Sequence, residues 1–236
     1  MKAFAFIGSK HKESSTLAFI TELLQSIKRD HINELEIQQL FTPSEYSICE
    51  CCGCTNCFIN GNCPIDDDMA IIKNGMLSSD IIIFASPVYL AQVTGSMKVF
   101  IDRISYWAHL FRLCGKVGVA VTVSDNNGND VASNYLKLVM RHLGLSVIRD
   151  IQLQLRPLKS TAAYMSIVET EAKLIGRHIQ NHDFPITFEQ NAIFLELKKA
   201  ISVQDDGLAE KEYWKANGYF DYDSYSHLFE RYCSLL

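Results

Sequence analysis

Four cysteines near residue 57 define the part of the sequence with the clearest chemistry. Their spacing is C-x2-C-x2-C-x5-C, and the set comprises Cys51, Cys54, Cys57 and Cys63. Thiolates at this spacing, with a proline behind the last one, are typical of a short loop that wraps a [4Fe–4S] cluster, because each thiolate must reach a different iron. Gly53 and Gly61 give the backbone the conformational freedom that such a wrap requires. The spacing therefore predicts an iron–sulfur site in this loop.

Three other kinds of cysteine chemistry remain open for the same loop. A structural zinc also uses four cysteines, although they usually come as two separated pairs. Any C-x-x-C pair here could act as a redox dithiol. A disulfide framework is typical of small secreted chains, whereas this one has 236 residues and no apolar signal segment after Met1 and Lys2. Cys49 and Cys52 are not needed for the cluster set, and Cys114 and Cys233 have the character of ordinary buried or surface cysteines.

The composition narrows the class of protein. Hydrophobic residues make up 48% of the chain, which suits one sizeable core built around a buried sheet. The net charge is −5 and no basic stripe runs along any segment, so we expect no nucleic-acid partner. The longest apolar runs, 81–85 and 117–123, have the length of strands and are far too short to span a membrane. Together with the many cysteines, this predicts a protein of the reducing cytoplasm.

Apolar runs alternate with helical patterns along the first 155 residues. Strands are expected at 2–8, 35–40, 80–85, 116–123 and 147–155. Helices are expected at 14–28, through Met69 to Met76, at 94–113 and at 130–143. Strands that alternate with helices through short connections predict an α/β fold with a doubly wound, parallel, five-stranded sheet.

The pattern changes after about residue 160. We expect a main domain over 1–160, with a cysteine-rich loop at 48–64, and a helical extension over 161–236. Helices in the extension are predicted at 163–181 and 187–202. An aromatic-rich tail over 212–225 must pack either on its own domain or on a neighbouring subunit. The second arrangement would make the extension an oligomerisation arm, and the sequence leaves both arrangements open.

Ligands of an open α/β sheet bind at the carboxyl ends of its strands, and three loops leave those ends here. The first, 8–16, offers four hydroxyls, two lysines and a helix N-terminus, which together suit a phosphate dianion. It contains neither the G-x-G-x-x-G of dinucleotide sites nor the Walker pattern. Glu13 would oppose a phosphate unless it points away, and Ser14 or Ser15 could simply cap the helix.

The other two loops could enclose a flat ligand. The second, 85–95, contains Ser86-Pro87-Val88-Tyr89, which combines a rigid backbone with an aromatic side chain able to border a ring. It could equally be a proline turn with a buried tyrosine. The third loop, 124–129, is polar and could lie over a ligand or be a plain turn.

These loops resemble those of flavodoxin-like NAD(P)H-dependent FMN reductases. The resemblance rests on the serines and Thr16 of the first loop, the Ser-Pro-Val-Tyr turn and the helix that runs through residues 97–103. The cysteine stretch, with Asp67-Asp68-Met69 after it, is similar to the iron–sulfur flavoprotein branch of that superfamily. The similarity covers about residues 1–155, and the tail around 213–215 resembles the C-terminal arms of some relatives.

The resemblance implies a flavodoxin-like fold with strand order 2-1-3-4-5 and a bound FMN. The phosphate would lie on the first loop and the isoalloxazine ring against residues 87–90, with the 124–129 loop opposite. That loop has one glycine where many relatives have several. The implied FMN residues are Ser9, Ser14, Ser15, Thr16, Ser86, Pro87, Val88, Tyr89, Leu90, Ser124, Asn126 and Gly128. The family's unit is at least a dimer, so a homodimer or homotetramer is implied.

The sequence therefore leads us to expect an FMN-containing oxidoreductase. It would transfer electrons between NAD(P)H or a reduced carrier and an acceptor such as a quinone or a redox protein. We assign no side chain as a catalytic acid or base, because the flavin carries the chemistry. Two alternatives are an FMN reductase without a cluster and a non-enzymatic, flavodoxin-like electron carrier.

The helix expected at 94–113 carries two further sets of residues. Lys98, Asp102 and Arg103 are interpreted as charges on its exposed side, where they could pair with one another or across an interface. Trp107 and Phe111 are expected to build the core or an interface and not to touch the flavin.

Overall fold

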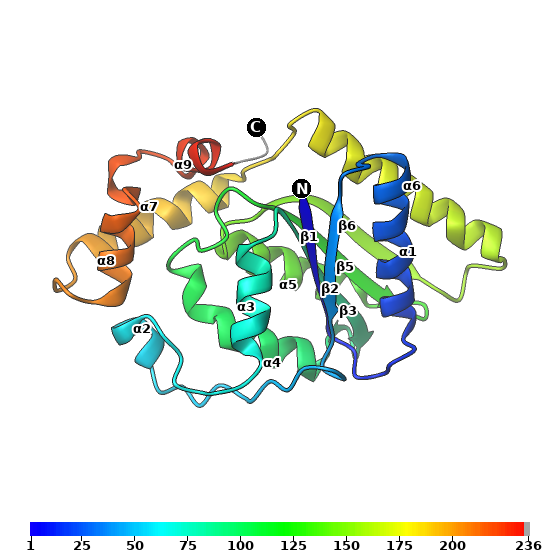
Figure 1. The fold of residues 1–236 in the computed structure, drawn as a ribbon, viewed down its shortest axis with the longest axis horizontal. Helices are drawn as coiled ribbons and strands as arrows, with labels where there is room; N and C mark the ends of the chain where they lie inside the picture. The colour runs from blue at the N-terminus through cyan, green and yellow to red at the C-terminus, as the bar shows by residue number, and fades with distance from the viewer. Residues whose placement is uncertain (234–236) are drawn as a thin grey trace.

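A computed structural model describes residues 1–233, apart from the side chain of Gln39. Its sheet is parallel and has the strand order β2-β1-β3-β5-β6. These strands are β1 (Lys2–Ile7), β2 (Glu36–Phe41), β3 (Ile81–Tyr89), β5 (Val117–Ser124) and β6 (Ser146–Gln154). A short strand, β4 (Gln92–Val93), pairs antiparallel with the end of β3. Among the parallel strands of the described chain, the order is the predicted 2-1-3-4-5, so the flavodoxin-like fold is confirmed (Figure 1).

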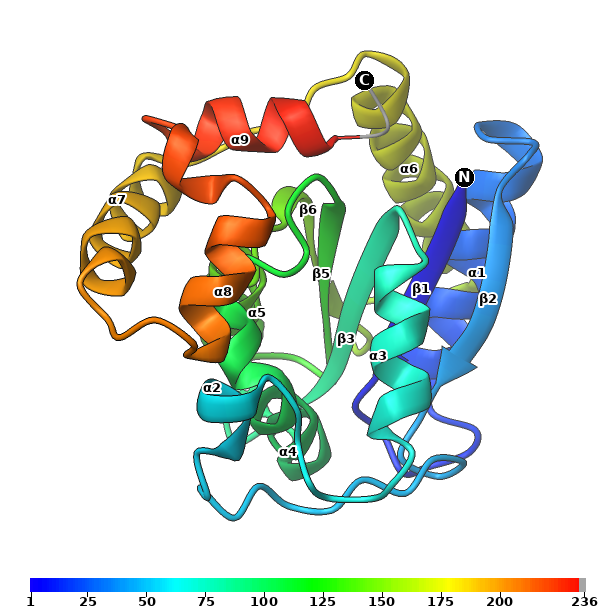
Figure 2. The ribbon, with the colours of Figure 1, turned by 60° about the vertical axis from the view of Figure 1, so that its left-hand side comes forward.

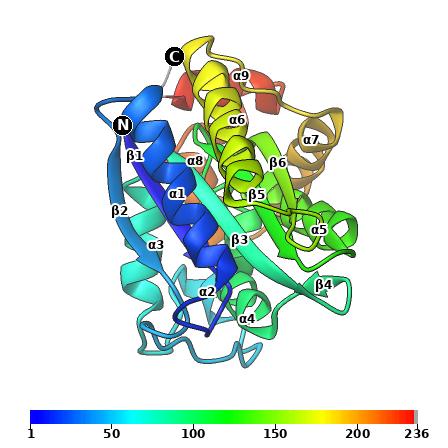
Figure 3. The same ribbon diagram turned by 90° about the vertical axis from the view of Figure 1, so that its right-hand side faces the viewer.

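Helices cover both faces of the sheet. On one face lie α1 (Ser15–Asp30) and α6 (Thr161–Gln180), as Figure 3 shows most directly. On the other face lie α3 (Met69–Leu77), α4 (Gly95–Ile104) and α5 (Asn129–His142). The remaining helices are α2 (Asn56–Asn60), α7 (Phe188–Ser202), α8 (Ala209–Ala216) and α9 (Tyr225–Tyr232). None of the helices within residues 1–233 combines the length and apolarity that a membrane crossing requires.

The strands are buried on both faces, which explains why their sequences are continuously apolar. Successive side chains point to opposite faces of the sheet. In β1, for example, Ala3, Ala5 and Ile7 pack with the α1–α6 layer. Phe4 and Phe6 belong to the core on the opposite face. A sheet that separates two cores in this way holds the carboxyl ends of its strands rigidly in place.

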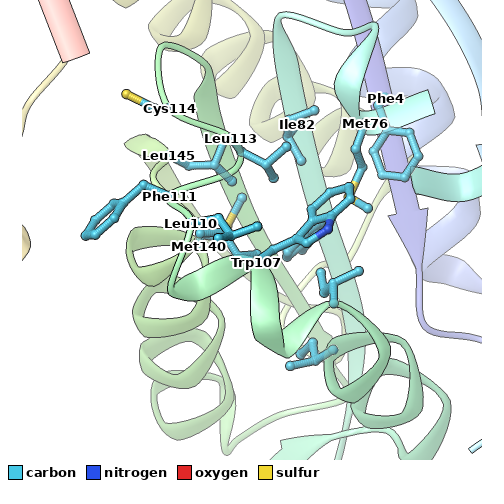
Figure 4. Packing of buried hydrophobic residues seen from close by; sticks show 14 of the residues in the cluster. Phe4, Met76, Ile82, Trp107, Leu110, Phe111, Leu113, Cys114, Met140 and Leu145 are labelled. Atoms are coloured by element: carbon cyan, nitrogen blue, oxygen red, sulfur yellow. The ribbon is translucent and has the colours of Figure 1, made fainter. Parts of the chain in front are cut away.

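The helix expected at 94–113 is shorter than predicted. α4 ends at Ile104, and residues 105–108 form a 3-10 turn. Trp107, Phe111 and Leu113 are all buried in the same core, which also contains Met76 and Met140 (Figure 4). Their side chains would not all lie on one face of a straight helix, so burying them requires the chain to leave it. The prediction that Trp107 and Phe111 build the core is confirmed.

The aromatic tail packs against its own chain. The Trp214 ring is stacked on Phe194 of α7, with centroids 5.2 Å apart, and its indole N–H donates to the carbonyl of His109 over 2.8 Å. The Tyr225 hydroxyl donates to the carbonyl of Gly144 over 2.5 Å. α8 thereby lies beside α2 of the cysteine loop (Figure 2). The oligomerisation arm stays a prediction, and residues 234–236 of the expected extension lie outside the described part.

Candidate functional site

The three loops predicted to bind a ligand meet around one cavity of about 420 Å³ at the carboxyl edge of the sheet. Eight of the twelve residues predicted from the sequence line it: Ser9, Ser14, Ser15, Thr16, Pro87, Val88, Tyr89 and Ser124. Ser86, Leu90, Asn126 and Gly128 are outside the lining. The side chains that sequence reasoning missed are His11, Val123, Asp125 and Leu155, and Glu13, whose direction the sequence leaves open, also lines the cavity. His11, Glu13 and Asp125 lie within the predicted loops, whereas Val123 lies near the end of β5 and Leu155 directly after β6, outside them. Which of these side chains face the cavity depends on tertiary structure.

The first loop brings hydroxyls and a helix N-terminus to the cavity. Ser14 is the N-cap of α1, and its side-chain oxygen accepts a hydrogen bond from the N–H of Leu17 over 3.1 Å. The capping interpretation of Ser14 is therefore right, and the residue also lines the cavity. Ser15 is exposed, whereas Ser9 and Thr16 are buried. The free N–H groups of the first turn of α1, together with its positive dipole end, favour an anion here.

Gly8 fixes this loop against the start of α4. A Cβ atom at position 8 would lie 2.7 Å from the Cβ of Met97, which is closer than real contacts allow. The Thr94 hydroxyl donates to the carbonyl of Gly8 over 2.5 Å, and the N–H of Gly8 donates to the carbonyl of Ala85 over 2.8 Å. The first two loops are therefore locked together, and only glycine fits between them.

The second loop is more regular than predicted, because β3 continues to Tyr89. Ser86 is fully buried: its hydroxyl donates to the carbonyl of Pro87 over 2.8 Å and accepts from the N–H of Thr94 over 3.1 Å. Its role in this structure is to shape the loop. Tyr89 is 65% exposed, which excludes the buried-tyrosine interpretation, and Leu90 is completely exposed.

The hairpin that joins β3 to β4 is strained. Leu90 and Ala91 both have positive φ angles, 49° and 59°, without being glycine. Two-residue hairpin loops favour this geometry, but side chains make it costly. Such strain is often found at binding loops. Val88 and the exposed ring of Tyr89, which lead into this hairpin, line the cavity, where a flat ligand could cover them.

The third loop is held by Asn129 at its end. The Ser124 hydroxyl donates to the side-chain oxygen of Asn129 over 2.5 Å, and the amide of Asn129 donates to the carbonyl of Leu153 over 3.2 Å. Gly128 has a φ of +77°, and a Cβ there would lie 3.0 Å from the Cα of Ala91. Gly128 therefore permits a close contact between this loop and the β3–β4 hairpin. Asn126 is exposed.

The cysteine loop surrounds a second, smaller cavity of about 150 Å³. Cys51, Cys57 and Cys63 line it together with Arg103 and Tyr106, whereas Cys54 does not. No disulfide joins the cysteines within residues 1–233, so a disulfide framework is absent from that part of the chain. No three potential ligands within these residues converge as a formed metal site.

Arg103 is buried beside this cavity, and its predicted exposure is wrong. The side chain is 1% exposed and forms an ion pair with Asp67, which is 4% exposed. Its Nη2 atom lies 3.6 Å from the Cys63 sulfur, within hydrogen-bonding range for sulfur. The expectation failed because the partner is 36 positions away in the sequence. Lys98 and Asp102 do form the expected exposed pair, with 2.5 Å between Nζ and the carboxylate.

Burial and hydrogen bonds shift the pKa values of this region in opposite directions. Burial alone raises the pKa of Asp67, but the hydrogen bond from Arg103 and backbone N–H donors bring it below the usual value. Burial likewise raises the pKa of the Cys57 thiol. A backbone hydrogen bond from Asn56 lowers the pKa of Cys54.

A second cation stands near the same thiols. Nζ of Lys73 lies 5.8 Å from the centroids of both the Tyr106 and Trp107 rings. Burial lowers the pKa of Lys73, while negative charge at Cys63 raises it. Arg103 is paired with Asp67, and Asp102, which also lines the cavity, is paired with Lys98. Lys73 adds a further positive charge near Cys57 and Cys63, which suits anionic thiolate ligands. The donor chemistry therefore fits an iron–sulfur cluster, in which each thiolate would bind a different iron.

Comparison with known proteins agrees with this geometry. Residues 1–156 match the family of NADPH-dependent FMN reductases. An iron–sulfur flavoprotein of Archaeoglobus fulgidus is 32% identical over 146 residues, which are 61% of this chain and 64% of the relative. An iron–sulfur flavoprotein of Methanosarcina thermophila is 30% identical over 153 residues, 64% of this chain and 78% of the relative. A solved structure titled flavone reductase has a TM-score of 0.62 at 14% identity, covering 79% of this chain and 66% of that one, which supports the fold alone.

The chain belongs to the NADPH-dependent FMN reductase family, in its iron–sulfur flavoprotein branch. The matched residues contain all three loops of the larger cavity and the whole cysteine loop. The chain spans just under two thirds of the length of the Archaeoglobus relative.

Proposed function

We propose that this protein is an FMN-dependent oxidoreductase that transfers electrons between NAD(P)H or a reduced carrier and an acceptor such as a quinone or a redox protein. The observation that carries the proposal is the cavity of about 420 Å³ where a hydroxyl-rich loop, the start of α1 and the β3–β4 hairpin meet. Membership of the FMN reductase family supports FMN as the ligand. When bound, FMN supplies the hydride and electron chemistry.

The protein's own residues bind and orient the ligand. Ser9, Ser15 and Thr16 would hold the phosphate together with the first N–H groups of α1. The backbone of Pro87 and Val88 would support one face of the ring, with Tyr89 at its edge. Glu13 and Asp125 also line the cavity, and their negative charges weaken phosphate binding. Asp125 is partly neutralised by its ion pair with Arg156.

The cysteine loop extends the proposal to a second cofactor. Cys51, Cys54, Cys57 and Cys63 would bind a [4Fe–4S] cluster, which supplies one-electron transfer when it is present. Support comes from the cations beside Cys57 and Cys63 and from the iron–sulfur flavoprotein relatives. The second candidate is an FMN reductase without a cluster. The match of residues 1–156 to the FMN reductase family is compatible with this second candidate.

The setting of this activity is also proposed. We propose a homodimer or homotetramer in the cytoplasm, without nucleic-acid or membrane partners. The net charge of −5 supports the absence of a nucleic-acid partner.

Steady-state kinetics test the enzymatic role. FMN-loaded protein is mixed with NADH or NADPH and a quinone, and loss of nucleotide absorbance is followed. Sustained turnover that falls in a Ser15→Asp variant at limiting FMN supports an FMN-dependent enzyme, because that variant should bind FMN about 30-fold more weakly. Negligible turnover combined with rapid reduction by a ferredoxin would show that the protein is an electron carrier instead.

A further inference from the structure

The cysteine loop is closed at a narrow neck where its two ends meet. At its N-terminal end, the N–H of Ser47 donates to the carboxylate of Asp68 over 2.7 Å. The N–H of Cys49 donates to the carboxylate of Asp67 over 2.8 Å. At its C-terminal end, the N–H of Asp68 donates back to the carbonyl of Ser47 over 3.2 Å. These bonds hold residues 47–49 beside residues 67–68.

Arg103 of α4 binds both ends of this neck. Its Nη1 atom donates to the carbonyl of Cys49 over 2.8 Å and also to the carboxylate of Asp67. Its Nη2 atom donates to the other carboxylate oxygen of Asp67 over 3.1 Å. One guanidinium thus contacts the carbonyl of Cys49, near the N-terminal end of the loop, and the carboxylate of Asp67, just after its C-terminal end. A lysine in its place could not make these bonds at once, because its three donors lie on one nitrogen.

The same guanidinium also reaches into the smaller cavity. Nη2 of Arg103 stands 3.6 Å from the sulfur of Cys63, the last of the four cysteines, and the side chain lines the cavity with Cys51 and Cys57. Its Nε atom is buried and has no hydrogen-bond partner within the described residues. An unpaired buried donor is costly, so Nε leaves Arg103 with one donor that still requires an acceptor.

We propose that Arg103 is a positioning residue for the iron–sulfur cluster: it closes the neck of the cysteine loop and donates an N–H···S hydrogen bond to Cys63. This inference rests on the proposed cluster. Partners of metal ligands fix ligand orientation, and their loss typically lowers metal affinity by about 10- to 100-fold. Hydrogen bonds to cluster sulfurs, together with nearby positive charge, stabilise the more negative reduced state and raise the reduction potential. Arg103 therefore both retains the iron and raises the potential.

The test compares three variants with the wild type after anaerobic reconstitution with ferrous iron and sulfide. Arg103→Gln removes the positive charge and the two Nη groups that donate side by side to Asp67. Arg103→Lys keeps the charge but has a single donor nitrogen. Lys28→Gln is the matched control, because it removes one positive charge from an exposed position of α1, which covers the opposite face of the sheet from α4. Three quantities are measured: iron per bound FMN, the rate of iron loss to a chelator, and the reduction potential of the cluster by titration with spectroscopic detection.

We expect Arg103→Gln to lose iron at least about ten times faster than the wild type and to have a lower cluster potential. Arg103→Lys should also lose iron faster, with a potential between those of Arg103→Gln and the wild type. Lys28→Gln should match the wild type. FMN content should be unchanged in all variants, which reports on their folding. If Arg103→Gln fails to fold, Arg103→Lys decides the result.

Three outcomes would overturn the proposal, and they are distinguishable. If the wild-type protein binds FMN but takes up no iron, the proposed cluster does not exist. Wild-type iron loss and potential in both Arg103 variants would show that the arginine has no role at a cluster that exists. Loss of FMN together with iron in both variants would identify an arginine that supports only the fold.

Discussion

Replacing Ser15 by aspartate should separate the stability of α1 from the affinity for FMN. Ser15 is the first residue of α1, is exposed and lines the larger cavity. The first turn of α1 contains no acidic residue. An aspartate there interacts favourably with the helix dipole, which should stabilise the folded protein by about 0.3–1 kcal/mol. The same carboxylate would face the phosphate of FMN.

The size of the repulsion follows from the charges. Two unit charges about 4 Å apart interact by about 1 kcal/mol in water and about 4 kcal/mol at the effective dielectric constant of a protein surface. A phosphate monoester carries a charge of about −1.5 to −2 at pH 7. Even with the screening of bulk water, Ser15→Asp should therefore weaken FMN binding by about 2 kcal/mol, or about 30-fold.

The assay is a fluorescence titration of apoprotein with FMN at low and high salt, alongside urea unfolding. Ser15→Asn is the control, because it has nearly the same shape without the charge. The Asp variant should bind weakly at low salt and recover part of its affinity at high salt, because ions screen the repulsion. A folded Asp variant with wild-type affinity for FMN would show that the phosphate does not bind at the 8–16 loop.

Three shorter predictions concern other parts of the molecule. Trp214→Ala should destabilise the protein by about 3–5 kcal/mol in urea unfolding, because it empties a buried aromatic cluster; a loss below about 1 kcal/mol would contradict the packing of the tail. Glu13→Gln should tighten FMN binding by up to about 1 kcal/mol, because it removes a charge from the cavity lining, and unchanged or weaker binding would show that Glu13 is remote from the phosphate. In anaerobically reconstituted protein, Cys57→Ala should lose iron and keep FMN, whereas Cys49→Ala should keep both; the reverse pattern would refute the assigned ligand set.

The sheet could be predicted because its information is local. Each buried strand is a continuous apolar run bounded by polar loops, and each run in 1–155 became a strand of the expected sheet. The first ligand loop was also predictable, because hydroxyls at the start of a helix are recognisable in sequence. β3 runs past its expected end because Ser86 and Pro87 continue to pair with β5. The sequence does not predict this pairing, because Ser-Pro is typical of a turn.

The role of Arg103 could not be predicted from the sequence. Its neighbours Lys98 and Asp102 do lie on an exposed face, so the local pattern assigned Arg103 to that face as well. The contact that buries it comes from Asp67, on a loop distant in sequence. Likewise, α4 ends at Ile104 because Trp107 and Leu113 are both buried in the core, which a continued straight helix would not allow. Long-range packing decided both features.

The cofactor content of anaerobically reconstituted protein tests the proposed function most directly. Acid-released flavin is identified by chromatography, and iron and sulfide are measured on the same sample. The proposal predicts one FMN and about four irons per chain, as expected for a cluster held by four thiolates. FAD, or no flavin at all, would contradict the assignment of the larger cavity, and FMN without iron would contradict the cluster and leave an FMN reductase.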